Sequence, residues 1–261
     1  DNWVTAAYSL TFWYNNRFLL LARYNLGLSA ALAGTGVCIS SEVLREIGWS
    51  TVTLTEDLEY SMQALLKGYR TAFALETRVY DEKPLRFLLS CRQRLRWARG
   101  QINVAFRCAP ALLCKGLRGG NPAQIEGGLR LMQLFVIAVG ALLVPLALFF
   151  PEICAGSPYG YLRAHYPYIG ALLAAGPYLL PPLTMLLDRL PRKPFLFYPL
   201  YPLFCLTWIV IIFVALFSWR NRSWMPTRHT RALDHRSMKR GITYRRPAGL
   251  HGLTVLPARE D

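Results

Sequence analysis

Apolar residues are distributed unevenly along this 261-residue chain, with three long runs in its second half. The runs cover residues 129–150, 166–187 and 195–218, and only the first contains a charge, Arg130, near its start. A helix of this length can cross ~30 Å of hydrocarbon, because it rises about 1.5 Å per residue. Buried core helices would satisfy the same pattern, but three such runs close together favour a transmembrane region over residues 128–219.

The first half has shorter apolar stretches that alternate with polar and turn-forming residues. Gly27, Gly48 and Gly68 each follow such a stretch and are typical helix stops. Thr53 or Thr55 can cap a helix whose first turn is acidic. The pattern predicts a helix over residues 3–28, a short strand or loop over 33–40, helices over 41–47 and 55–67, a strand over 70–77, and a long basic helix from Pro84 past Gln101. Helices that alternate with strands predict an α/β domain ahead of the apolar runs.

The net charge of +15 is concentrated in two blocks, Arg86–Arg130 and Arg220–Arg246, on either side of the apolar runs. Basic segments beside membrane spans are typically cytoplasmic and face anionic lipid. Nucleic acid is a weaker interpretation, because no zinc, helix-turn-helix or RNA-binding signature accompanies the charge. Three complete spans would place the basic tail outside the cell. We therefore expect that one run is interfacial or re-entrant, or that the number of spans is two and not three. The prolines of 166–187 and 195–218 make these two runs the candidates.

Thr55, Glu56 and Asp57 form a short motif at a predicted helix start. Asp57 is the candidate general base, since a carboxylate on a rigid element can take a proton from an attacking hydroxyl group. The same three residues are also an ordinary capped helix start, and this plain interpretation is favoured when the triplet is considered alone.

A second motif, Gln93-Arg94-Leu95-Arg96-Trp97, lies on the predicted long basic helix. Positions 93, 96 and 97 share one face of a helix. Arginine binds diphosphate in a bidentate manner, and tryptophan offers a flat apolar face to a sugar ring. The alternative is an amphipathic interfacial helix whose other arginines reach lipid head groups, and both interpretations can hold for one helix.

Together these motifs resemble those of the membrane-embedded, processive glycosyltransferase family 2 enzymes, which include cellulose, hyaluronan and poly-N-acetylglucosamine synthases. The matching elements occur in the family's order: Gly34-Thr35-Gly36, then Thr55-Glu56-Asp57 with Gly68-Tyr69, then Gln93 to Trp97, then apolar spans. The resemblance implies the C-terminal half of an α/β domain of the GT-A type, followed by an interfacial helix and an α-helical transmembrane region. The implied domains are an acceptor-side catalytic half over 1–83, an interfacial segment over 84–127, the transmembrane region over 128–219 and a basic cytoplasmic tail over 220–261.

On the donor side, the resemblance makes Asp57 the counterpart of the catalytic base, with Thr55 and Glu56 shaping the start of its helix. The counterparts of the groups that hold the donor's pyrophosphate are Gln93, Arg94 and Arg96. The family also binds Mg²⁺ or Mn²⁺ with the nucleotide through an Asp-x-Asp, which this chain lacks, so we expect no metal site within it. We further expect a truncated chain that lacks the nucleotide-binding half and is inactive alone.

On the acceptor side, the resemblance places Trp97 against the end of the growing glycan. It places Gly34 and Thr35 in a loop near the acceptor sugar. A gating segment of hyaluronan synthases is similar to Trp224, Thr227 and Arg228, although this chain has Pro226 as an extra residue. This segment would have to face the cytoplasm in order to reach the nucleotide, in agreement with the charge of the tail.

The predicted function is inverting transfer of a sugar from a UDP-sugar to a growing polysaccharide at the cytoplasmic face of the plasma membrane. The glycan would leave through the spans of a multi-pass protein in the lipid bilayer, with an accessory membrane subunit as a further partner. N-acetylglucosamine is the favoured sugar, because Gly34-Thr35-Gly36 and the compact tail resemble bacterial N-acetylglucosaminyltransferases. Two alternatives remain: a non-processive lipid-linked glycosyltransferase, and a membrane transporter or channel subunit.

Overall fold

The computed structural model describes residues 2–77, 79, 81–150, 152, 156, 158–221 and 223. Regular secondary structure in these residues is helical throughout. The elements are α1 (Trp3–Tyr14), a π-helix η1 (Asn15–Leu21), α2 (Ala22–Asn25), α3 (Ser41–Ile47), α4 (Glu56–Leu66), α5 (Phe87–Arg118), α6 (Pro122–Leu131), α7 (Gln133–Phe149), α9 (Pro158–His165), α10 (Pro167–Leu187), a 3-10 helix η2 (Lys193–Leu200) and α11 (Tyr201–Ser218).

The first predicted helix forms as one continuous helical segment made of α1, η1 and α2. Asn2 caps it, because its side chain accepts hydrogen bonds from the backbone amides of Val4 and Thr5. Gly27 ends it with a φ of +71°, a left-handed conformation that glycine adopts without strain. The prediction of a helix over residues 3–28 is therefore confirmed, apart from its last residues, which form a turn.

Helices α3 and α4 also lie where the sequence predicts them. The Ser40 side chain accepts a hydrogen bond from the Glu42 amide at the start of α3, and Gly48 follows the last residue of this helix. Helix α4 begins after Thr55 and is followed by Gly68 in a left-handed conformation. Both glycines therefore end helices, as their places in the sequence indicate.

The strand predicted over residues 70–77 is wrong, because this segment forms no ladder with any described part of the chain. One backbone hydrogen bond joins it to the segment after α2, from the Ala30 amide to the Thr71 carbonyl (3.0 Å). The Thr71 amide donates to the Ser29 side chain (3.0 Å) rather than to a backbone carbonyl. A strand needs a repeated pattern of backbone bonds. The α/β architecture is thus not formed by the described residues, and 33–40 is a loop.

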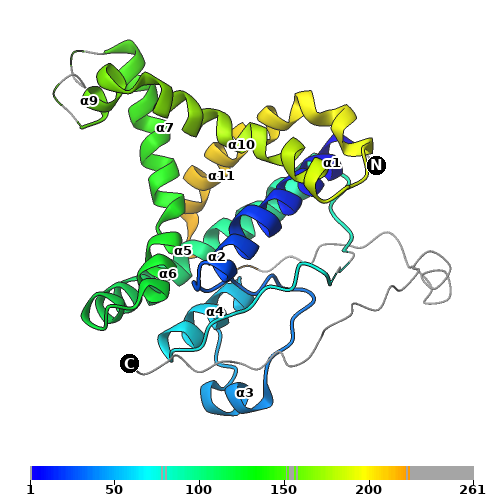
Figure 1. Ribbon diagram of the computed structural model, residues 1–261, viewed down its shortest axis with the longest axis vertical. Helices are drawn as coiled ribbons and strands as arrows, with labels where there is room; N and C mark the ends of the chain where they lie inside the picture. Colours follow the sequence, from blue (N-terminus) through cyan, green and yellow to red (C-terminus); the bar gives the residue numbers. More distant parts are fainter. Residues whose placement is uncertain are drawn as a thin grey trace.

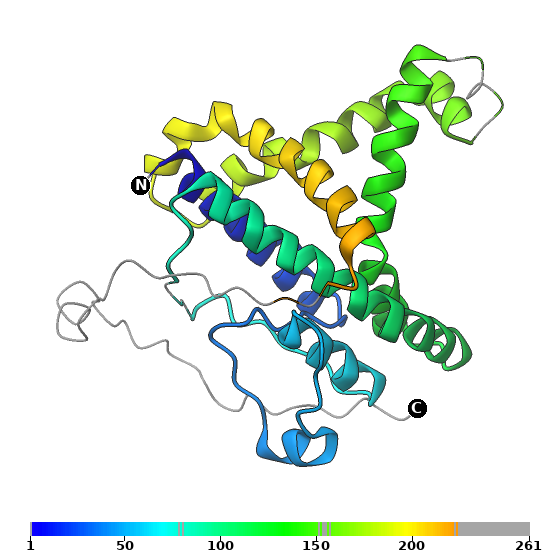
Figure 2. The same ribbon diagram turned by 180° about the vertical axis from the view of Figure 1, so that it is seen from behind.

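Helix α5 is the central element; it begins at Phe87, three residues after the predicted start, and continues past Gln101 as predicted, ending at Arg118. Helices α3 and α4 lie on one side of α1 and α5, whereas α7, α10 and α11 lie on the other side (Figures 1 and 2). Helices α4, α5 and α6 share a buried apolar cluster: Met62, Leu65, Val104, Ala105, Cys108, Ala109, Leu112, Ala123 and Leu131. This shared core fixes α4, which carries the first motif, against α5, which carries the second.

Among the described residues, one helical segment is long and apolar enough to cross a membrane, Lys193–Ser218, which comprises η2 and α11. Helix α6 with the first part of α7 would qualify as a second, but it is bent by 50° at the break between them. Helix α10 matches the predicted run 166–187 to within one residue, and its part Tyr178–Leu187 is a shorter apolar helix. Only 28% of the most apolar stretch of Lys193–Ser218 is buried inside the described structure, whereas the core helix of a soluble protein is mostly buried.

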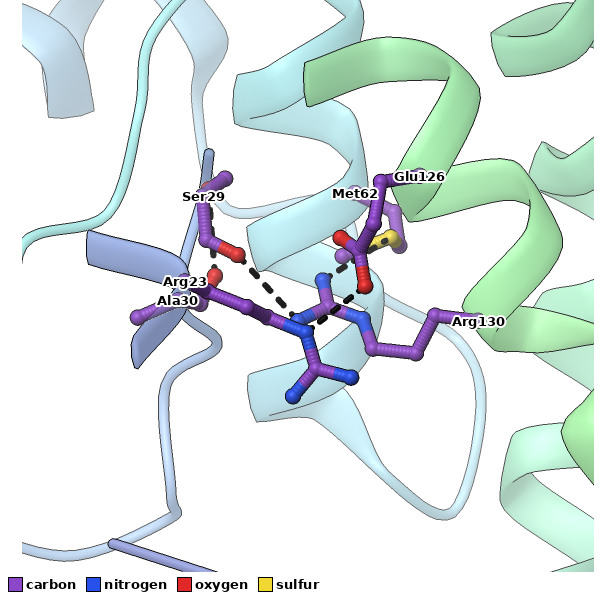
Figure 3. A network of polar contacts seen from close by, with 6 residues as sticks. All are labelled: Arg23, Ser29, Ala30, Met62, Glu126 and Arg130. Atoms are coloured by element: carbon purple, nitrogen blue, oxygen red, sulfur yellow. Dashed lines mark hydrogen bonds and ion pairs between the residues drawn. The ribbon is translucent and has the colours of Figure 1, made fainter. Parts of the chain in front are cut away.

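A polar network joins α2, α4 and α6 on the side of α5 that carries α4 (Figure 3). Arg23 donates from Nε to the Glu126 carboxylate (2.6 Å). Arg130 donates to the Ser29 carbonyl (3.2 Å), and its guanidinium contacts the sulfur of Met62 (4.0 Å). Since Ser29 begins the segment that leads to Gly34, the network fixes one end of that loop to α6.

Candidate functional site

Asp57 lies in the first turn of α4, and its carboxylate is approached closely by the loop that contains Gly34. Its Oδ1 accepts a hydrogen bond from the Leu58 amide (2.8 Å). A Cβ atom added at Gly34 would lie 3.2 Å from Asp57 Oδ2, and Gly34 has a φ of +72°. The structure therefore brings together two residues from separate motifs, and the loop can reach the carboxylate because position 34 is a glycine.

Burial raises the pKa of the Asp57 carboxyl above its ordinary value, and the nearby Glu56 raises it further. The backbone hydrogen bond from Leu58 and the positive charge of Arg96 act in the opposite direction. A carboxylate with a raised pKa is a stronger base than an ordinary aspartate and remains ionised at neutral pH unless the shift is large. The environment of Asp57 thus suits a group that accepts a proton.

Thr55 occupies the N-cap position of α4, but its side chain makes no capping hydrogen bond. Its Oγ1 is buried without a partner, so the predicted cap is wrong in its chemistry although it is right in its position. Instead Thr55 packs against α5 at Gly100, where an added Cβ would lie 2.5 Å from Thr55 Oγ1 and Cγ2. Position 55 therefore serves as a contact between the two motif-bearing helices.

The carboxylate of Glu59 holds the segment that precedes α4. It is fully buried and accepts hydrogen bonds from the backbone amides of Val52 (2.9 Å) and Thr53 (2.8 Å). Arg107 of α5 lies 3.4 Å from its other oxygen. The sequence indicates only that the first turn of this helix is acidic; the bonds from Glu59 back to the preceding loop are a feature that the structure adds.

The second motif places Gln93 and Trp97 against α1. Gln93 Oε1 accepts a hydrogen bond from the Tyr8 hydroxyl (3.0 Å). The Trp97 ring meets the rings of Tyr8 and Phe12 edge to face, at centroid distances of 6.1 and 6.2 Å. Gln93 and Trp97 therefore share one helical face, as predicted, and Trp97 is only partly buried there. Arg96, the third position predicted for this face, acts instead on Asp57 of α4.

Arg96 lies close enough to Asp57 to lower the pKa of that carboxyl. Its Nε is buried and has no hydrogen-bond partner among the described residues. An arginine that retains unused donors near a carboxylate can bind an additional anion, such as a diphosphate, beside a group that accepts a proton. Arg96 and Asp57 are the pair of predicted site residues that the fold brings together from different helices.

Arg94 lies elsewhere, fully buried against α11. It donates from Nη1 to the Thr207 hydroxyl (2.7 Å) and its guanidinium lies 4.2 Å from the centre of the Phe204 ring. The structure thus separates Arg94 from the surroundings of Asp57. Thr35 and Glu56 are exposed beside the site, whereas Trp224, Thr227 and Arg228 lie outside the described residues.

A divalent metal is the one cofactor that the resemblance implies. The described part of the chain has no group of three or more His, Cys, Asp or Glu residues that could hold a metal ion. The two buried or half-buried acids of α4 are engaged otherwise: Glu59 by backbone amides, and Asp57 by the Leu58 amide next to Arg96. These residues do not fit a metal site, and we assign no step to a metal here.

Comparison with known proteins gives a family match that covers most of the chain. Residues 1–219 match the family model described as glycosyl transferase family group 2. Cellulose synthase 2 of Novacetimonas hansenii is 32% identical over 134 residues, which are 49% of this chain and 8% of that protein. The UDP-forming cellulose synthase 1 catalytic subunit of Komagataeibacter xylinus is 31% identical over 128 residues, 48% of this chain and 17% of that protein.

A plant protein is similar over a shorter segment. Probable glucomannan 4-beta-mannosyltransferase 7 of Oryza sativa subsp. japonica is 31% identical over 78 residues, 30% of this chain and 13% of that protein. The matched segment is therefore a small part of each of these relatives. No solved structure matches the chain.

Proposed function

Because this chain belongs to glycosyl transferase family group 2, we propose that it provides the acceptor-side half of a polysaccharide-synthesising glycosyltransferase. The observation that carries the proposal is that two other segments act on the carboxylate of Asp57: the loop of Gly34 approaches it closely, and the positive charge of Arg96 lowers its pKa. A base and a cation for a leaving diphosphate are the two groups that inverting sugar transfer needs from the protein side.

In this reaction a carboxylate oxygen of Asp57 takes the proton of an acceptor hydroxyl group. The acceptor oxygen forms a bond to the anomeric carbon of the donor sugar, while the bond from that carbon to the UDP oxygen breaks on the opposite side. The configuration at the anomeric carbon is therefore inverted. Arg96 and Gln93 hold the negative charge that develops on the departing diphosphate, and Thr55 and Glu56 shape the helix start that carries Asp57.

The acceptor sugar lies near Gly34 and Thr35, on the side of Asp57 that the loop approaches. Trp97, which is partly buried against α1, provides an indole edge and part of a ring face for the end of the glycan. The tail segment of Trp224, Thr227 and Arg228 gates the nucleotide from the cytoplasm. Arg94 acts from a distance by fixing α5 to α11.

We further propose that α11 and the bent pair α6–α7 contact the lipid bilayer of the plasma membrane, with the motifs on its cytoplasmic side. Large apolar side chains are exposed on these helices, including Phe217 (89%), Val136 (68%) and Val210 (64%). Such a surface is unfavourable in water and is typical of a membrane or protein contact. The growing glycan leaves through these helices, together with an accessory membrane subunit.

The donor is a UDP-sugar. The sequence motifs and the named relatives indicate different sugars for it. The loop Gly34-Thr35-Gly36 favours N-acetylglucosamine, whereas the named relatives make cellulose or glucomannan. The experiment is to incubate membranes that contain the full-length protein with one labelled donor at a time, in the presence of Mg²⁺ or Mn²⁺. The donors are UDP-N-acetylglucosamine and UDP-glucose, and GDP-mannose is the control for a GDP-linked sugar. Labelled high-molecular-weight glycan from one UDP-sugar, lost in Asp57→Asn, is the expected result and identifies the sugar.

Other outcomes of the same experiment separate the alternatives. Label confined to the lipid extract would favour a non-processive lipid-linked glycosyltransferase. No transfer from any donor, together with no UDP binding, would contradict the transferase proposal and favour a transporter or channel subunit. In that case Asp57 and Trp97 would tolerate substitution.

A further inference from the structure

Gly100 lies one helical turn after Arg96 on α5 and faces Thr55 across the contact between α5 and α4. A Cβ at this position would lie 2.5 Å from both Thr55 Oγ1 and Thr55 Cγ2, and 2.9 Å from Thr55 Cβ. Close-packed protein interiors do not hold nonbonded atoms this near to each other. A side-chain rotation at Thr55 would not relieve the overlap, because its Cβ does not move when χ1 changes.

The segment around Thr55 cannot easily yield. Thr55 is buried, and the amides of Val52 and Thr53, just before it, are held by the buried carboxylate of Glu59. Asp57 follows Thr55 by two residues on the same helix start. A side chain at position 100 would therefore press on the first turn of α4, which carries Asp57, and not merely on a side chain that can rotate away.

We propose that Gly100 is a positioning residue, whose lack of a side chain sets the spacing between the Asp57 carboxylate and the Arg96 guanidinium. This inference rests on the proposed function, because the spacing matters for a reaction in which both groups act at once. It adds a third position to the two motifs: the glycine does not touch substrate, but it determines how closely the base and the cation approach each other.

The first test compares Gly100→Ala with Gly116→Ala in membranes that contain the full-length protein. Gly116 is a matched control on the same helix, since its added Cβ would lie 2.8 Å from Ile125 of α6 and makes no contact with Thr55. We expect Gly100→Ala to lower kcat by about 100-fold, the scale of a misplacement of about 1 Å. Gly116→Ala should leave kcat per folded protein much closer to that of the wild type, because its added Cβ does not touch the first turn of α4.

A double-variant cycle keeps the test decisive if Gly100→Ala folds poorly. Replacing Thr55 with glycine removes all three atoms that the added Cβ would meet. We therefore expect Gly100→Ala to cost little further activity in the Thr55→Gly background, whatever the activity of Thr55→Gly itself. An equal loss in both backgrounds would overturn the inference, because it would mean that the effect does not pass through Thr55.

A pH profile separates positioning from general damage. Glu56 and Arg96 are the charged groups that act on Asp57, and Arg96 lowers its pKa. If Gly100→Ala moves the two apart, the acid limb of the kcat profile shifts to higher pH, a change that a loss of folded protein cannot produce. An unshifted limb would overturn the inference.

The outcome also shows which claim fails. Transfer by the wild type with equal effects of Gly100→Ala and Gly116→Ala would overturn the role of Gly100 alone. No transfer by the wild type would overturn the proposed function, and the role of Gly100 with it.

Discussion

Helix α5 presents opposite faces to two regions of the molecule, and the two contacts differ in how their polar groups are satisfied. Toward α11, Arg94 donates to Thr207, Arg99 donates to Ser218, and Asn103 donates to the Trp219 carbonyl. Toward α4, Thr55 Oγ1 and Arg96 Nε are buried and have no partner among the described residues. Arg94 Nε, on the α11 side, is buried without a partner in the described part of the chain as well. The two contacts therefore differ in what holds them: side-chain hydrogen bonds cross the contact with α11, whereas Thr55 and Arg96 make none across the described contact with α4.

The two arginines of the second motif, Arg94 and Arg96, lie toward these two different regions. Arg94 and Arg96 are two residues apart, so they point to well-separated sides of the helix. Buried polar groups are normally hydrogen-bonded, and exceptions are expected at functional sites. The hydrogen bonds to α11 fix the helix on that side, and under the proposed function the unpartnered groups toward α4 are those that meet the substrate.

Asp57→Asn should have the largest effect of any single change at the α4 contact. We expect transfer to fall by about 10²–10⁴-fold, the usual contribution of a general base, while UDP binding is retained. Glu42→Gln is the matched control, because Glu42 is an exposed acid in the first turn of the neighbouring helix α3. Rates of label incorporation measure the effect, and full activity of Asp57→Asn would contradict the assignment.

The two arginines provide the next test, since the same replacement should give different kinds of loss. Arg96→Gln should raise the KM for the donor roughly 10- to 100-fold, because a charge-assisted bond to diphosphate is worth about 1.5–3 kcal/mol. Arg94→Gln should instead lower the melting temperature and leave the donor KM unchanged per folded protein. Exposed Arg92→Gln serves as the control for both. Equal donor KM values for the Arg94 and Arg96 variants would remove the contrast between the two faces.

The raised pKa of Asp57 predicts a pH-dependent contribution to stability. A folded-state pKa above the unfolded value means that the folded protein binds this proton more tightly than the unfolded chain does. Stability is therefore fully present below the unfolded pKa and is lost as pH rises through the raised folded pKa. We expect Asp57→Asn to be more stable than the wild type at neutral pH, and this gain to vanish in acid. Melting temperatures across pH measure it, and a variant less stable at neutral pH would contradict it.

The network in Figure 3 should give the smallest effect on transfer. Glu126→Gln weakens the bond from Arg23 and should destabilise the protein by about 1–3 kcal/mol, the cost of losing a bond to a charged group. Exposed Glu76→Gln should have no such effect. Denaturant unfolding measures the difference, and a loss of transfer without a loss of stability would indicate that the network belongs to the site.

The sequence predicted the residues of the site better than their surroundings. Asp57, Gly34 and Arg96 could be found because motifs state which side chains are present. Gly100 and Glu59 could not be found in this way. The role of Gly100 depends on a close approach between two helices, and that of Glu59 on a bond back to the preceding loop, and both depend on tertiary packing. The strand over 70–77 failed for a similar reason: local propensity favours an extended segment, but a strand requires neighbours, and the described residues supply one backbone bond there.

The most direct measurement of the central claim is amide hydrogen exchange of the full-length protein in detergent, with and without UDP. The claim is that Asp57 of the first motif and Arg96 of the second act at one site on the α4 face of α5. We predict slower exchange with UDP in peptides that cover residues 52–60 and 91–101, and no change in the peptide of α11, residues 201–218. Protection confined to α11, or no protection of either motif at saturating UDP, would contradict it.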